Sequence, residues 1–76
     1  MNYDLAMMAL EGMARSPLRV TSSNGEIIVE ASGATFKELA RLCLLLGGAQ
    51  ETEDAFELQP GVHVGKDSPG VMLRLV

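Results

Sequence analysis

The sequence predicts an α+β fold in one domain of 76 residues, with an N-terminal helix followed by the order β-β-α-β-β. Three observations support this prediction. An apolar helical pattern occupies residues 35–48, an Asn-Gly pair separates two strand-like runs before it, and two short apolar alternations follow it. Short connections between consecutive strands favour antiparallel pairing. We therefore expect a mostly antiparallel four-stranded sheet with one strongly apolar helix packed across it.

The N-terminal segment, residues 1–15, has the pattern of a first helix. Leu5 and Met8 recur at helical spacing, but the opposite side of this helix is apolar as well. Pro17 ends the helix because the residue before a proline is pushed out of the helical region. This helix either packs on the ββαββ core of residues 18–76 or docks onto a second subunit as an oligomerisation element.

Two strands of a hairpin are predicted on either side of the Asn-Gly pair, in residues 18–22 and 26–31. Asn and Gly both tolerate the positive φ that a two-residue hairpin loop requires. In the second strand Ile27, Val29 and Ala31 point to one side and the glutamates to the other. We expect the aliphatic side to lie on the core and the other side to face mostly solvent.

The main helix is predicted from Thr35 to Gly48. Thr35 and Glu38 have the spacing of a capping box, in which each side chain satisfies a free backbone amide of the first turn. Two glycines then suit the left-handed turn that ends a helix. The face expected to contact the core, at a period of 3.6 residues, consists of Phe36, Leu39, Ala40, Cys43 and Gly47.

An acidic loop follows the main helix, and two strands complete the sheet. Residues 56–59 are the first of these strands, with Phe56 and Leu58 directed inward. Residues 62–64 are either a short strand or a continuation after a bend. Residues 71–76 form the last strand, in which alternate apolar residues again define an inward face.

Composition limits what the protein is expected to bind. Ten acidic residues against six basic ones give a net charge of −4, which argues against direct nucleic-acid binding because phosphate contacts need a basic face. The same charge permits a basic protein partner. The N-terminus does not have the pattern of a signal peptide, and no run approaches the ~20 apolar residues of a membrane span. We expect a cytoplasmic protein without membrane contact.

No motif of known chemistry occurs in the sequence. Nucleotide-binding and nucleophile patterns are absent. The only histidine, His63, has no partner acid or cysteine placed by the sequence, and the only cysteine, Cys43, is expected to be an inert thiol in the core. We therefore expect no enzymatic activity, no cofactor and no metal site.

From Glu26 to Val76 the sequence resembles the small immunity proteins of polymorphic-toxin systems, in particular immunity protein family 32. The resemblance rests on the strand EIIVEAS, the leucine-rich helix FKELARLCLLL, the strand and turn FELQPG, and the terminal strand VMLRLV. It covers about two-thirds of the chain. It implies a protein that binds and neutralises a cognate toxin made by the same cell.

Two contact surfaces are predicted. The concentrated negative charge of the loop after the main helix would attract a basic partner such as a toxin domain, although such a charge run is more often simply a solvated loop. The predicted partner-binding residues are Glu51, Glu53, Asp54 and Glu57. A homo-oligomer is also expected, because both helices have more apolar surface than one sheet can cover. Its predicted interface residues are Met7, Leu10, Leu42 and Leu45.

Three functions stay open at this point. The leading one is a small acidic binding protein that neutralises a partner protein by occlusion. The second is a structural or oligomerisation domain whose apolar helices build a homo-oligomer. The third is a phage-type anti-defence protein whose acidic surface imitates nucleic acid. A toxin gene directly upstream would favour the first, and a phage early operon the third.

Overall fold

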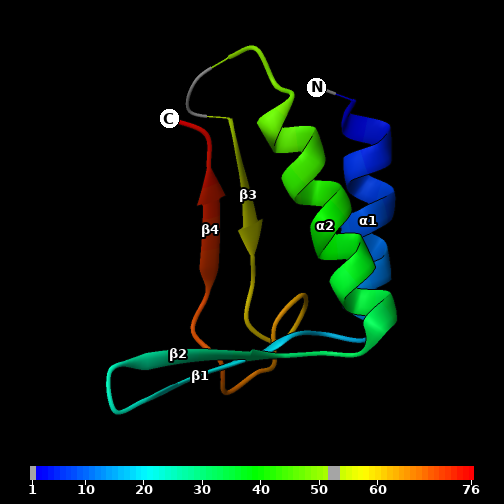
Figure 1. The fold of residues 1–76 in the computed structure, drawn as a ribbon. Helices are drawn as coiled ribbons and strands as arrows, with labels where there is room; N and C mark the ends of the chain where they lie inside the picture. Colours follow the sequence, from blue (N-terminus) through cyan, green and yellow to red (C-terminus); the bar gives the residue numbers. More distant parts are fainter. Residues whose placement is uncertain (1, 52–53) are drawn as a thin grey trace.

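The computed structural model describes residues 2–51 and 54–76 and confirms the α+β class (Figure 1). The elements, in chain order, are the helix α1 (Tyr3–Arg15), the strands β1 (Arg19–Ser23) and β2 (Glu26–Glu30), the helix α2 (Gly33–Gly47), and the strands β3 (Ala55–Leu58) and β4 (Val71–Arg74).

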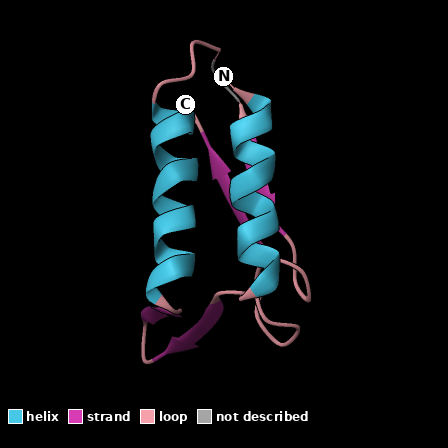
Figure 2. Cartoon of the chain, turned by 90° about the vertical axis from the view of Figure 1, so that its right-hand side faces the viewer, coloured by secondary structure: helices cyan, strands magenta, loops and turns pink. Residues whose placement is uncertain are grey.

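The two helices form one layer and the β3–β4 hairpin forms a second layer on one face of it. α1 and α2 run antiparallel and side by side, and β3–β4 lies behind them in Figure 2. The β1–β2 hairpin crosses the end of the molecule at which α1 ends and α2 begins. In the described part of the chain each hairpin is a separate two-stranded antiparallel sheet. The predicted four-stranded sheet is not present among these residues.

The loop between β3 and β4 keeps the two hairpins apart. The Leu18 amide donates to the His63 carbonyl at 2.9 Å, and the Gly65 amide donates to the Leu18 carbonyl at 2.7 Å. The Val20 amide then donates to the hydroxyl of Ser68 at 3.0 Å. This loop therefore occupies the edge of β1 at which β3 or β4 would have to pair.

Replacing Ser68 by alanine should lower the free energy of unfolding by about 1 kcal/mol, because the buried Val20 amide loses its acceptor. Urea denaturation followed by circular dichroism measures this change. Ser22→Ala is the control, since Ser22 is exposed on β1 and should shift stability by less than about 0.5 kcal/mol. Equal urea midpoints for the two variants would contradict this role of Ser68.

The core lies between the helix pair and the β3–β4 hairpin. Phe56 and Leu58 point into it, as the alternation predicted, and Val64 joins them from the loop that follows. The core is aliphatic apart from one aromatic ring and one methionine. Its buried apolar residues are Ala6, Ala9, Met13, Leu18, Val20, Leu42, Leu46, Phe56, Leu58 and Val64.

The buried face of α2 is not the one predicted. Thr35, Leu42 and Leu46 are buried, whereas Phe36 is 42% exposed and Cys43 is exposed. The prediction of Cys43 as a core thiol is therefore wrong. Apolar residues recur at the helical period on both the predicted face and the observed buried face, because leucines occupy almost every position in the second half of the helix. Periodicity alone does not distinguish them.

The start of α2 also differs from the prediction. The helix begins at Gly33, and its N-cap is Ser32, whose hydroxyl accepts from the Thr35 amide at 3.2 Å. Thr35 is thus inside the first turn, and its own hydroxyl donates to the Ser16 carbonyl at the end of α1. The capping box of Thr35 and Glu38 is wrong. Thr35 instead joins the two helices.

The β1–β2 hairpin has the predicted turn but not the predicted core face. Asn24 and Gly25 both have positive φ, at 51° and 83°. Every residue of β2 is exposed, and Ile27 is 68% exposed. The hairpin projects past the end of the helix pair, so β2 has no layer to pack on (Figure 1).

Candidate functional site

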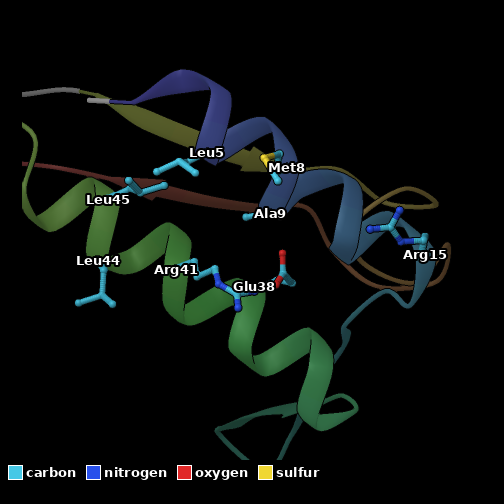
Figure 3. Close-up of a pocket in the computed structure, with 8 residues that line it drawn as sticks. All are labelled: Leu5, Met8, Ala9, Arg15, Glu38, Arg41, Leu44 and Leu45. Atoms are coloured by element: carbon cyan, nitrogen blue, oxygen red, sulfur yellow. Dashed lines mark ion pairs between the residues drawn. The ribbon is translucent and has the colours of Figure 1, made fainter.

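One face of the helix pair is left open by the rest of the described chain. The β3–β4 hairpin covers the opposite face (Figure 2). A groove of about 610 Å³ lies between the two helices, and only α1 and α2 contribute its lining. The lining residues, drawn in Figure 3, are Leu5, Met8, Ala9, Arg15, Glu38, Arg41, Leu44 and Leu45.

One end of this groove is apolar. Leu5 of α1 and Leu45 of α2 approach each other there, and Met8 continues the α1 wall (Figure 3). Leu44 lies beside them and points outward, with 77% of its surface exposed. Leu5 is 50% exposed and Met8 is 63% exposed. A contiguous apolar surface of this kind is typical of an interaction site.

The other end of the groove is charged. The Glu38 carboxylate lies between the helices with 18% of its side chain exposed, and it pairs with Arg41 one turn further along α2. Arg15 projects from the last turn of α1, where its charge complements the helix dipole. Among the residues described, no carboxylate lies within ion-pair distance of Arg15.

Gly12 of α1 leaves room for the side chain of Glu38 between the helices. A Cβ at position 12 would lie 2.8 Å from Glu38 Oε2 and 3.0 Å from Glu38 Cγ, so a side chain there would displace the glutamate. A side chain at this crossing would therefore require Glu38 to move, and glycine avoids that displacement although it is a poor helix former.

Gly12→Ala should stabilise the protein by about 1 kcal/mol in a Glu38→Ala background, where only the gain in helix propensity remains. In the parent the added methyl group should displace Glu38 from Arg41, and this should offset the gain. A double-mutant cycle by chemical denaturation measures the difference. The contact is refuted if Gly12→Ala has the same effect in both backgrounds.

The predicted acidic surface is only partly assembled. Glu51 is exposed and Asp54 is partly buried, and both line a small hollow of about 230 Å³ at the start of α1. Glu57 is exposed on β3, on the side away from the core. Glu53 lies outside the described residues.

The predicted oligomer residues are dispersed. Leu45 lines the groove, and Leu10 packs partly against the core. Met7 is 55% exposed and does not line the groove, while Leu42 is fully buried inside the chain and offers no surface.

The predicted interface residues do not include Leu5, Met8 or Leu44, which the structure places at the open apolar surface. The available signal was the apolar circumference of the first helix, because one sheet can cover only part of it. That signal predicted a contact surface but not the side on which it lies.

His63 makes a structural contact within a turn. His63 is half-buried, and its Nδ1 accepts from the Gln59 amide at 3.1 Å within a turn. No group of three or more potential metal ligands occurs in residues 2–51 and 54–76. Neither helix in the described part of the chain has both the length and the apolar character needed to cross a membrane.

Comparisons with protein-family models, with characterised proteins and with solved structures found no match for this chain. The fold and the groove define an α+β protein with an open helical face, and its function is inferred from that face.

Proposed function

We propose that this protein is a small binding domain that masks a partner protein by occlusion, with the groove between α1 and α2 as its contact surface. The observation that supports this function is the open apolar end of the groove. Leu5, Met8 and Leu44 are each at least half exposed there. Covering them would remove apolar surface from water at about 25 cal/mol per Å².

The shape of the groove favours an amphipathic helix as the element of the partner that binds. Two antiparallel helices with an open seam accept a third helix by interlocking side chains, as in helical bundles. The apolar stripe of the incoming helix would cover Leu5, Met8 and Leu45. A carboxylate of the same helix would pair with Arg15 at the charged end.

Acidic residues near the apolar end of the groove favour one direction for the bound partner helix. The apolar end of the groove contains Leu5 in the first turn of α1, and the hollow lined by Glu51 and Asp54 also contains Tyr3 at the start of α1. A partner helix with basic residues near one end and acidic residues near the other would satisfy both ends. Attraction to Glu51 and Asp54 would act mainly on the association rate and would weaken with salt.

Neutralisation of a cognate toxin is the specific form of this function that we propose. It is supported by the resemblance of residues 26–76 to immunity proteins and by an acidic surface suited to a basic toxin domain. A structural role as a homo-oligomer is the second candidate, because the same apolar face could be covered by another copy of the chain.

A photo-crosslinking amino acid at position 44 tests the proposal in the cells that make this protein. Leu44 points outward from the groove, so a bound partner should be crosslinked there. The control position is Val76, which is 96% exposed and belongs to neither helix. We expect one heterologous protein to be captured from position 44 and not from position 76.

The captured partner then allows a direct measurement of affinity. Leu44→Glu should weaken binding by about tenfold or more, since a charge would be buried in an apolar contact. Val76→Glu, at a residue that is 96% exposed, should leave it unchanged. Capture of a second copy of the chain alone would favour the oligomerisation domain. Equal capture from both positions would overturn the groove as the contact surface.

A further inference from the structure

β2 has an unpaired edge made of exposed aliphatic residues. One edge of β2 pairs with β1, and no other strand pairs with β2 in residues 2–51 and 54–76. Its sequence is EIIVE, and its three aliphatic residues are exposed: Ile27 by 68%, Ile28 by 39% and Val29 by 41%. Native proteins usually protect such an edge with charged side chains, especially lysine, or with proline or a bulge. β2 has no lysine, proline or bulge, and its only charges are the glutamates at its two ends.

The backbone of β2 is oriented to accept another strand. In an antiparallel ladder, pairs that exchange hydrogen bonds alternate with pairs that do not. The Val20 amide donates to Ser68, and so points away from β2. Val20 and its partner Val29 are therefore a pair without ladder bonds, and so are Ser22 and Ile27. It follows that the amides and carbonyls of Ile27 and Val29 face the open edge.

We propose that this edge binds an extended, basic segment of another protein, which adds to the hairpin as a third strand beside β2. Main-chain hydrogen bonds to Ile27 and Val29 would hold the segment, and side-chain pairs would select it. The hairpin is already anchored on its other side, because the loop after β3 occupies the edge of β1.

The charges of β2 favour a basic segment over a second copy of the chain. Glu26 and Glu30 lie at the two ends of the strand, on the same side as Ile28. Antiparallel pairing of two β2 strands centred on Ile28 would place Glu26 opposite Glu30 at both ends, and like charges directly opposite each other are unfavourable. Lysine or arginine at positions i and i+4 of the added segment, with an aliphatic residue at i+2, would form two favourable pairs instead.

One of these carboxylates already has a partner within the hairpin. Arg19 of β1 pairs with Glu30 at 3.0 Å, through Oε1, and both side chains are more than half exposed. Glu30 Oε2 therefore stays accessible to a second cation. No residue of β2 lines the groove between α1 and α2, so the two sites are made of different residues.

A peptide titration of the full chain tests the inference. The probe is Ser-Lys-Val-Ile-Val-Lys-Ser, and the control peptide has glutamate in place of both lysines. Amide resonances of the isotopically labelled protein report the contact residue by residue. We expect the basic peptide to shift the Ile27 and Val29 amides and to slow their hydrogen exchange by about tenfold or more. The acidic peptide should do neither.

Variants separate this site from the groove. Val29→Pro removes the amide that faces the open edge, which an edge strand tolerates, and it should abolish binding of the basic peptide. Glu26→Gln with Glu30→Gln should weaken binding and remove its salt dependence. Leu44→Glu should bind the peptide like the parent, since it changes only the groove.

Three outcomes would overturn the inference. The first is an absence of protection at Ile27 and Val29 with the basic peptide present. The second is equal binding of the acidic and basic peptides. The third is protection of these amides that rises with protein concentration without any peptide, which would identify a second copy of the chain as the occupant.

Discussion

Leu42→Ala should lower the free energy of unfolding by about 2–5 kcal/mol, the usual range for truncation of a buried leucine. Leu42 is fully buried where α2 meets the core, so the truncated side chain would leave a cavity. A domain of this size has only about 5–10 kcal/mol of stability in total. The variant should therefore lose a large part of the stability of the fold. Chemical denaturation followed by circular dichroism measures the loss.

Leu44→Ala is the matched control for this prediction. It removes the same atoms from the same helix two residues later, but Leu44 is 77% exposed and should cost less than about 0.5 kcal/mol. Leu39 is only partly buried, so the loss of stability from Leu39→Ala should fall between the losses from Leu42→Ala and Leu44→Ala. A larger loss at Leu44 than at Leu42 would mean that α2 packs with a different face.

Thr35→Val should destabilise the protein by about 2–3 kcal/mol, although valine has nearly the same shape as threonine. The Thr35 hydroxyl donates to the Ser16 carbonyl, which ends α1, and accepts from the hydroxyl of Ser32, which caps α2. Thr35 is almost completely buried, so water cannot easily replace these bonds. The substitution would leave the Ser16 carbonyl without its partner and loosen the junction of the two helices.

Thr21→Val is the control for the threonine substitution. Thr21 is exposed in the middle of β1, where valine fits a strand at least as well as threonine does. The melting temperature of the Thr21→Val variant should equal or slightly exceed that of the parent protein. If Thr35→Val melts at the same temperature as Thr21→Val, the hydroxyl of Thr35 does not hold the helices together.

Local conformation was determined by the sequence where a single residue restricts the backbone. Pro17 ends α1 near the predicted residue, and α1 has its C-cap at Ser16. Asn24 and Gly25 form the predicted hairpin turn because both accept positive φ. Phe56 and Leu58 alternate with exposed residues, and this alternation located the inner face of β3. These features depend on dihedral preferences and short-range periodicity alone.

The location of the open surface was decided by the tertiary structure. Leu42 and Leu44 belong to one run of leucines, and no local property distinguishes the fully buried residue from the one that lines the groove. The distinction arises because the β3–β4 hairpin covers only one face of the helix pair. Ile27 shows the same dependence, since its strand was predicted correctly but extends past the layer on which it was expected to pack. Burial is a property of the assembled layers, and that is why these exposed apolar residues are defined only in the folded chain.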